Sequence, residues 1–220
     1  MERRFEFSIG EFYHVYNRGN NKSTIFFDDK DRARFQKLLY ICNGSKPVVF
    51  KNVQGVPLDK IDVGEKLVDI GLYCLMPNHF HLLLREIKEG GISRFMEKMS
   101  TAYSMYFNKK YNRTGKLFEG RFQASHIQDD RHLKYLFCYI HLNPVKIINL
   151  NWRTAEIKSA NETQKYLDQY TYSSFMDYKS VSRKEDIILN KSSFPEYFSE
   201  PREFEKFIDE WLTIQGMPLD

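Results

Sequence analysis

Apolar positions follow two different spacings along the chain, and the first of these predicts three β-strands. Residues 12–16 read Phe-Tyr-His-Val-Tyr and run into an Asn-Arg-Gly turn, a combination of aromatic and β-branched residues that is typical of a strand. Residues 71–76 and 80–85 are two further apolar runs, joined through Pro77 and Asn78. These runs predict the strands of a β-sheet.

The second spacing, three or four residues, predicts helices. It occurs in residues 28–42, which begin with acidic residues, and again in residues 92–111. A third amphipathic segment begins at Asp129 and Asp130, which are good helix-starting residues, and we expect it to end before Pro144.

The remaining segments complete an α+β arrangement. Residues 43–69 are punctuated by Gly and Pro, which predicts a hairpin-like excursion or a long loop, and residues 115–127 are expected to be irregular and extended. The resulting order is β-α-β-β-α followed by β-α. This order indicates an antiparallel sheet covered by helices.

The chain changes character beyond about residue 149. Residues 166–175 are rich in Tyr, Ser and Thr, and residues 201–215 have the pattern of a terminal amphipathic helix. We therefore expect a catalytic domain in residues 1–150 and a helical or irregular C-terminal extension in residues 151–220, packed on or beside the core.

Composition narrows the class of protein only slightly. The chain has 220 residues, 42% hydrophobic and 28% charged, which indicates a soluble globular protein of one domain or one domain with an extension. Lys and Arg exceed Asp and Glu by 33 to 29, which is compatible with a polyanionic partner but does not require one. Aromatic residues at 15% suit stacking on unpaired bases, although filling a core is their commoner role.

Cysteine usage and hydropathy predict a cytoplasmic protein. Cys42, Cys74 and Cys138 are odd in number and widely spaced, so neither a disulfide framework nor a structural zinc site is indicated. No apolar stretch reaches membrane-spanning length, so no membrane partner is expected.

The most specific chemical pattern is the pair His79 and His81 around Phe80. Successive side chains of a strand point to opposite faces, so these two imidazoles project to the same side of the sheet and can share one metal ion. An isolated pair of this kind is more often two ordinary histidines, because two ligands alone do not make a metal site. A third ligand must come from elsewhere.

The third predicted helix offers that ligand and a nucleophile. Tyr139 and Asn143 are four residues apart and share a helical face, so Asn143 could complete the metal shell while Tyr139 reaches a phosphate that the same metal polarises. Such a shell suits Mg²⁺ or Mn²⁺, with Mn²⁺ the better match to nitrogen donors. Alternatively, Tyr135 and Tyr139 form an aromatic helix face that packs on the sheet, and spacing alone does not decide between the two interpretations.

Other histidines are weaker candidates. His132 and His141 are ligands by residue type, but His141 lies two residues after Tyr139 and therefore on roughly the opposite side of the helix. We interpret His14 and His126 as structural or nucleic-acid-contacting residues.

Four motifs in one order carry a family resemblance. They are Tyr-His-Val-Tyr-Asn-Arg-Gly-Asn-Asn at 13–21, Met-Pro-Asn-His-Phe-His-Leu-Leu-Leu at 76–84, Gly-Lys-Leu-Phe-Glu-Gly-Arg-Phe at 115–122 and Tyr-Ile-His-Leu-Asn-Pro-Val at 139–145. Together they resemble the REP-associated tyrosine transposases, a branch of the single-tyrosine HUH transposases. The resemblance covers about residues 12–148, with a further echo at 170–175.

This resemblance implies a fold and a reaction. The fold is a ferredoxin-like antiparallel sheet flanked by helices, the HUH nuclease fold. His79 and His81 match the metal ligands, Tyr139 the nucleophile, and Asn143 the polar residue that completes the metal shell. Related enzymes cleave single-stranded or hairpin DNA through a 5′-phosphotyrosyl link, need a divalent metal but no ATP, and then join a second strand. A transposase of this type in a prokaryote would be cytoplasmic and associated with the nucleoid.

Basic residues inside the matched motifs are candidates for DNA contacts, because Arg can bond phosphate or guanine edges bidentately. Each of them could equally be a solvated surface charge. The four candidates are Arg18, Arg113, Lys116 and Arg121. The chain departs from the family at residues 45–66, which are longer than the compact link expected there.

Two other functions remain alternatives at this stage. One is a host-adapted protein that binds hairpin DNA without transposing it, against which the intact His79, His81, Tyr139 and Asn143 argue. The other is a metallohydrolase in which water attacks and Tyr139 only packs. A transposase of this family becomes covalently attached to DNA, whereas neither alternative does. The sequence leaves the oligomeric state open between a monomer and a homodimer.

Overall fold

A four-stranded antiparallel sheet forms the centre of the computed structural model, which describes residues 6–47, 49–149, 160–198 and 200–213. The strands are β1 (Phe12–Arg18), β2 (Val68–Met76), β3 (His79–Glu86) and β4 (Gln123–His126). Their order in the sheet is β2-β3-β1-β4, and every neighbouring pair is antiparallel.

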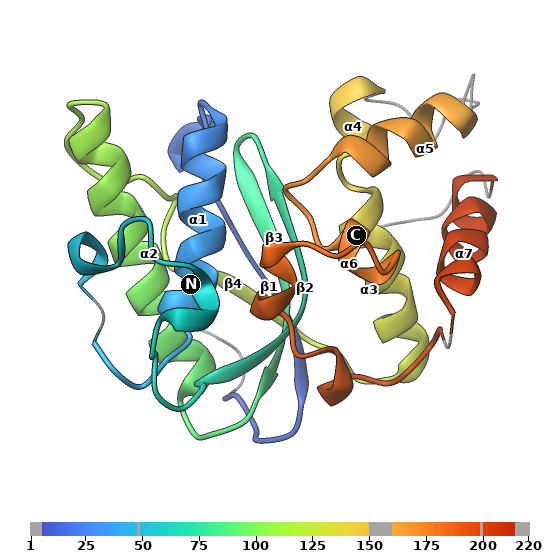
Figure 1. Ribbon diagram of the computed structural model, residues 1–220, viewed down its shortest axis with the longest axis horizontal. Helices are drawn as coiled ribbons and strands as arrows, with labels where there is room; N and C mark the ends of the chain where they lie inside the picture. The colour runs from blue at the N-terminus through green and yellow to red at the C-terminus, as the bar shows by residue number, and fades with distance from the viewer. Residues whose placement is uncertain (1–5, 48, 150–159, 199, 214–220) are drawn as a thin grey trace.

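Helices connect and cover the strands (Figure 1). The α-helices are α1 (Asp29–Ile41), α2 (Gly91–Lys110), α3 (Asp130–Leu142), α4 (Val145–Ile148), α5 (Ala160–Gln169), α6 (Phe175–Tyr178) and α7 (Pro201–Thr213). Short 3-10 helices lie at Asn20–Lys22, Phe50–Val53, Leu58–Lys60, Lys184–Ile188 and Lys191–Ser193. The order β1-α1-β2-β3-α2-β4 with these strand neighbours is the ferredoxin-like topology, which confirms the predicted α+β fold.

The two faces of the sheet receive alternate residues of β3. Phe80, Leu82 and Leu84 belong to the larger apolar core, which α1 and α2 close. Leu83 points to the other face, where the apolar side chains of α3 pack on β2 and β3. Because both faces are covered, these strands read as almost continuous apolar runs, and all nine residues of β2 are buried.

Helix α3 begins where the sequence predicts it. The side chain of Asp129 caps the helix by accepting a hydrogen bond from the backbone N–H of His132 at 2.7 Å. The helix ends at Leu142, but Asn143 and Pro144 keep right-handed helical angles and lead directly into α4. Pro144 therefore ends α3 without ending the helical path, because a proline is tolerated at the start of a new helix.

Most of the described part of the C-terminal segment packs on the α3 side of the sheet, whereas Lys184–Ile188 contacts α1. The Tyr170 hydroxyl donates to the backbone carbonyl of Leu75 at 2.5 Å. The Phe194 ring lies so close to Gly71 that a side-chain carbon added there would be 2.8 Å from it. Helix α7 confirms the predicted terminal helix through Thr213, and the last two residues of that prediction lie outside the described part. The boundary at residue 150 between a domain and its extension stays a prediction.

The segment between α1 and β2 is a long irregular excursion, as predicted. A bridge between Gly44 and Lys66 closes its base, and Ile41, Ile61 and Val63 form a small apolar cluster of their own. It enters β2 at Val68, the opposite end of that strand from the turn that leads to His79. The 45–66 region thus joins the sheet away from the predicted histidine pair.

No helix in the described part of the chain is long and apolar enough to cross a lipid bilayer. The three cysteines are buried and form no disulfide, as the sequence predicts.

Candidate active site

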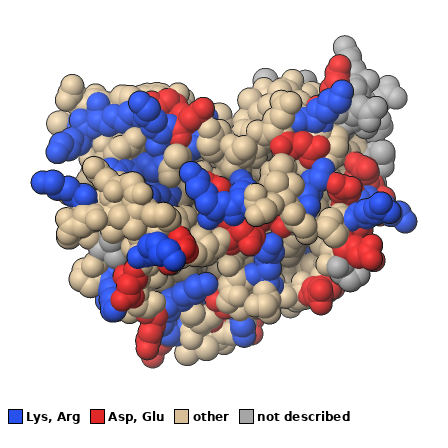
Figure 2. Space-filling view, in the orientation of Figure 1, with Lys and Arg blue, Asp and Glu red and all other residues tan. Residues whose placement is uncertain are grey.

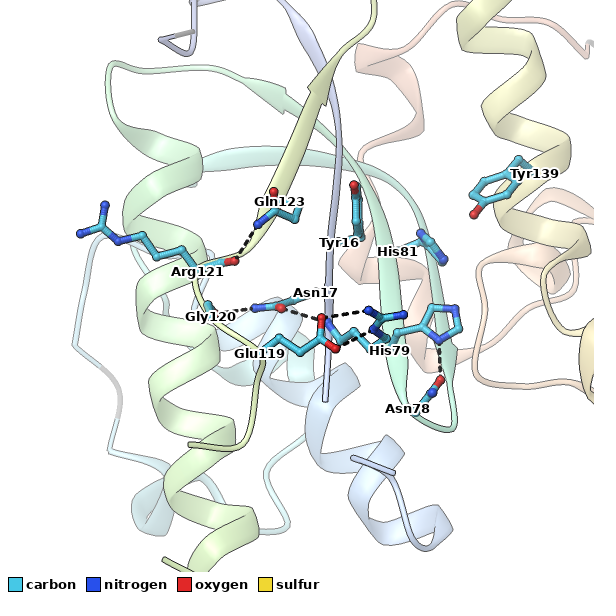
Figure 3. A pocket seen from close by; sticks show the side chains of 11 residues that line it. Tyr16, Asn17, Asn78, His79, His81, Glu119, Gly120, Arg121, Gln123 and Tyr139 are labelled. Carbon is cyan, nitrogen blue, oxygen red and sulfur yellow. Dashed lines mark hydrogen bonds and ion pairs between the residues drawn. The ribbon is translucent and has the colours of Figure 1, made fainter. Parts of the chain in front are cut away.

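The histidine pair lies at the beginning of β3, in the middle of the sheet. His81 is paired with Tyr16 of β1 and with Cys74 of β2. The imidazole rings of His79 and His81 lie 5.0 Å apart between centroids and nearly perpendicular to each other, on the face away from Phe80. The prediction that both imidazoles share one side of the sheet is confirmed (Figure 3).

A third histidine supports this pair, and sequence reasoning missed its position. The Nε2 atom of His14, on β1, lies 2.9 Å from Nδ1 of His81, and both side chains are buried. Burial lowers the pKa of His14 to about 3, so this imidazole is neutral at neutral pH. Because this contact occupies Nδ1 of His81, Nε2 is the His81 atom that would coordinate a metal. His14 therefore fixes the orientation of His81.

His79 is held in a comparable way. Its Nδ1 atom lies 2.6 Å from Oδ1 of Asn78, in the turn between β2 and β3. Burial lowers the pKa of His79 to about 4, and the positive charges of Lys146 and Arg18 act in the same direction. A metal-binding imidazole must be deprotonated, and His79 meets this requirement at neutral pH.

Tyr139 faces the histidines from α3. Its ring lies edge-on to His81 with 5.3 Å between ring centroids, and its hydroxyl points toward His81 and the pocket (Figure 3). Tyr135 stacks on Tyr139 at 5.9 Å but also contacts Trp211 of α7 at 5.7 Å. The two tyrosines do form an aromatic helix face, yet Tyr139 lines the pocket with the histidines and Tyr135 packs toward the C-terminal helix.

Asn143 lies fully buried at the end of α3, next to Tyr139. Its Nδ2 atom donates to the backbone carbonyl of Tyr139 at 3.0 Å, and its side chain lies close enough to His79 to act on the pKa of that imidazole. Its Oδ1 atom accepts a hydrogen bond from Nζ of Lys146 at 3.0 Å. The structure thus brings His79, Tyr139 and Asn143 together, and adds Lys146, which sequence reasoning did not single out.

A pocket of about 950 Å³ opens in front of these side chains. Its lining residues come from β1, the β2–β3 turn, β3, β4 and the segment before it, and α3: Tyr16, Asn17, Arg18, Asn78, His79, His81, Glu119, Gly120, Arg121, Gln123 and Tyr139. Glu119 and Gly120 form the pocket wall opposite Tyr139, and two hydrogen bonds join them to β1. The Asn17 side chain donates to the carbonyl of Gly120 at 3.1 Å, and the backbone N–H of Glu119 donates to the carbonyl of Arg18. The pocket is large enough for a nucleotide and has an apolar as well as a polar lining.

The four basic candidates separate into two groups. Arg18 and Arg121 line the pocket, whereas Arg113 and Lys116 do not. The Arg18 guanidinium forms a bidentate pair with Glu119 at 2.9 and 3.1 Å, and the Arg113 guanidinium lies 5.4 Å from the Phe107 ring. On the face seen in Figure 2, basic and acidic side chains are interspersed, in keeping with the small net charge.

His141 lies on the opposite side of α3, as predicted. Its Nε2 atom is 2.8 Å from Oγ of Ser174, and burial lowers its pKa to about 3. It packs against Phe175 and Phe204 in the C-terminal segment. His141 is a buried structural residue and not a candidate ligand.

The side chains present fit a catalytic metal better than a structural one. Among the described residues, no group of three or more His, Cys, Asp or Glu side chains could hold a metal ion. The imidazoles of His79 and His81 and the amide of Asn143 are the candidate donors that lie near one another. Such a set leaves coordination positions for a phosphate oxygen and water, which is the arrangement of catalytic sites.

Two comparisons with known proteins found similar proteins. A solved structure of a REP-associated tyrosine transposase bound to a REP hairpin is similar, with 15% identity and a TM-score of 0.49 over 90% of this chain and 91% of that chain. No curated protein matches the chain. The family model of the IS200-like transposases matches residues 62–143, less than half of the chain, and this stretch includes His79, His81, Tyr139 and Asn143. Residues 62–143 are thus similar to the IS200-like transposases, in agreement with the family that the sequence motifs resemble.

Proposed function

We propose that this protein is a transposase that cuts and joins single-stranded DNA next to a hairpin, with Tyr139 as nucleophile and a divalent metal as cofactor. The observation that carries the proposal is the Tyr139 hydroxyl, which points into the same pocket as His79 and His81. The match of this segment to the IS200-like transposases supports an enzyme that acts on DNA.

The proposed chemistry is one transesterification and its reversal. The Tyr139 phenolic oxygen attacks the phosphorus, the bond from phosphorus to the 3′-oxygen breaks, and a 5′-phosphotyrosine forms. The phenol releases its proton to water, and the departing 3′-oxygen takes up a proton from water. A 3′-hydroxyl of a second strand then attacks the phosphotyrosine and returns the phenol. The phosphodiester energy stays in the covalent link, so no ATP is needed.

His79, His81 and Asn143 would hold the metal. A divalent cation, Mg²⁺ or Mn²⁺, would polarise the scissile phosphate when bound there. The contribution of the protein is orientation: His14 fixes the ring of His81. Asn78 does the same for His79.

We propose that Arg18 and Arg121 bind the backbone of the DNA strand that enters the pocket, since they line it and Arg suits phosphate. Arg113 and Lys116 would contact DNA outside the pocket. The preference for a hairpin follows from the motif resemblance. A phosphate bound at Arg18 would compete with Glu119, which now occupies that guanidinium.

The decisive experiment is covalent capture. Purified protein is mixed with single-stranded oligonucleotides that carry a fixed imperfect hairpin and randomised single-stranded flanks, with Mg²⁺ or Mn²⁺. We expect an adduct that survives denaturation, requires the metal and disappears in Tyr139→Phe. Tyr135→Phe is the matched control, because it removes the neighbouring hydroxyl that does not line the pocket; it should retain adduct formation.

Each alternative function gives a different result. Cleavage that continues undiminished in Tyr139→Phe would indicate attack by water and a metallohydrolase. Hairpin binding without cleavage by the wild-type protein at any metal concentration would indicate a DNA-binding protein. Cleavage that is equally fast in the presence of a chelator would contradict the proposed role of the metal.

A further inference from the structure

Lys146 brings a positive charge to the candidate nucleophile. Its Nζ atom lies 3.0 Å from Oδ1 of Asn143 and 5.2 Å from the centre of the Tyr139 ring. After burial, its charge is the next largest cause of the lowered pKa of His79. The contacts with Asn143 and with the Tyr139 ring therefore place this ammonium among the side chains proposed to carry out the reaction.

The backbone explains how Lys146 reaches this position. Asn143 and Pro144 continue the helical path from α3 into α4, and the Lys146 backbone N–H donates to the carbonyl of Asn143 at 3.1 Å. Lys146 follows Asn143 by three residues and Tyr139 by seven, which puts all three on one face of a continuing helix. The side chain is half-buried, so its charge is less screened by water than that of an exposed lysine.

A positive charge at this place matches the charge that develops in the reaction. Negative charge spreads over the non-bridging oxygens of the phosphate as Tyr139 attacks, and the tyrosine oxygen becomes an anionic leaving group when the strand is rejoined. A preorganised cation close to the Tyr139 ring can stabilise the transition state of both steps.

We propose that Lys146 is a further catalytic residue, whose ammonium binds a non-bridging oxygen of the scissile phosphodiester beside Tyr139. This inference rests on the proposed function. The hydrogen bond to Asn143 holds the ammonium at the site before DNA arrives. Lys146 keeps its protons throughout, so it changes neither the atoms nor the electrons of the transesterification and serves cleavage and joining alike.

The first test compares single-turnover rates of adduct formation, at saturating metal and DNA, on an oligonucleotide recovered by covalent capture. Lys146→Met keeps most of the apolar stem and removes the charge, and we expect its rate to fall about a hundredfold. Lys146→Arg keeps the charge and should recover most of the loss. Lys134→Met is the control, because Lys134 lies on α3 but pairs with Asp130 at 3.0 Å and should react like the wild type.

A purely structural role for Lys146 predicts different results. If it only positioned Asn143, the defect of Lys146→Met would disappear when the metal concentration is raised to saturation, and the proposal would be wrong. A rate within about twofold of the wild type would also overturn it. If the wild-type protein forms no adduct, the proposed function is wrong. If the wild-type protein forms the adduct and the Lys146 variant reacts equally fast, only the role of Lys146 is wrong.

A binding measurement tests the same contact without cleavage. In chelator and in a Tyr139→Phe background, the scissile phosphate of the oligonucleotide is replaced by an uncharged methylphosphonate. We expect this replacement to weaken binding about fivefold when Lys146 is present and to have little effect in the Lys146→Met protein. Equal losses in both proteins would contradict the contact. Because the replacement changes only the DNA, the two oligonucleotides are compared on one and the same protein preparation, so the ratio does not depend on how well that protein folds.

Discussion

The two faces of the sheet are built from the same strands but hold different kinds of side chain. On the α1 and α2 face, β3 contributes Phe80, Leu82 and Leu84 to an apolar core. On the α3 face, the same strand contributes His79 and His81, and the His81 ring contacts Tyr139.

The difference shows how one strand can provide both stability and chemistry. The period of two places each of the two histidines beside a core residue in sequence but on the opposite side of the sheet in space. The α1 and α2 face holds the backbone of β3 in place, and the α3 face can then carry buried polar groups that would otherwise weaken a core. Neighbouring substitutions in β3 should therefore have opposite consequences.

The largest effect on stability is expected from Phe80→Ala. Phe80 is fully buried and packs edge-on or tilted against Phe118 and Phe35, at ring distances of 5.9 and 5.0 Å. Its removal leaves a cavity and should lower the free energy of unfolding by about 3–5 kcal/mol. Urea unfolding followed by circular dichroism measures this loss. A decrease in the free energy of unfolding below about 1 kcal/mol would show that packing on the α1 and α2 face does not hold β3 in place.

His81→Ala should do the reverse. We expect adduct formation to fall more than about a hundredfold, while the free energy of unfolding falls by only about 1–2 kcal/mol, because one buried hydrogen bond to His14 is lost. Single-turnover cleavage and urea unfolding of the same preparation give both numbers. If cleavage by His81→Ala decreased only in proportion to the fraction of folded protein, His81 would be a structural residue.

His14→Leu should weaken the metal site without removing it. Loss of the partner that orients His81 is expected to raise the metal concentration for half-maximal cleavage about tenfold, with a rate near that of the wild type at saturating metal. His126→Leu is the control, since His126 pairs with Glu11 at 2.8 Å on the edge strand. An unchanged metal requirement in His14→Leu would limit His14 to packing.

The smallest effect is expected for the basic residues. Arg121→Ala should weaken hairpin binding a few-fold and lower the slope of log affinity against log salt by about one, because one phosphate contact is lost. Lys116→Ala should leave cleavage at saturating DNA unaffected, because Lys116 does not line the pocket. Binding titrations at several salt concentrations separate the two. If Arg121→Ala and Lys116→Ala changed binding and cleavage to the same extent, residues that line the pocket would not differ from residues outside it.

Most of the fold was predictable, because each element has a strong local signal. The alternation around Phe80 and the three- and four-residue spacing of the helices required no knowledge of the tertiary structure. The strand β4 was foreseen only as an extended stretch, since its four residues alternate between exposed and half-buried positions and carry little apolar pattern.

The site was predictable only in its local pairs. His79 with His81, and Tyr139 with Asn143, follow from the periods of a strand and a helix. The contact of His14 with His81 depends on the register between β1 and β3, which pairs His14 with Leu83 and cannot be read from either strand alone. Lys146 was missed because Pro144 indicates the end of a helix, whereas here it begins the next one.

The measurement that tests the central claim most directly is the identity of the residue that carries DNA. The adduct is digested with a protease and a nuclease, and the nucleotide-bearing peptide is sequenced by mass spectrometry. Tyr135 and Tyr139 lie on the same helix, so fragment ions must separate them. The account predicts a 5′-phosphonucleotide on Tyr139, and an adduct on Tyr135 or on any other residue would contradict it.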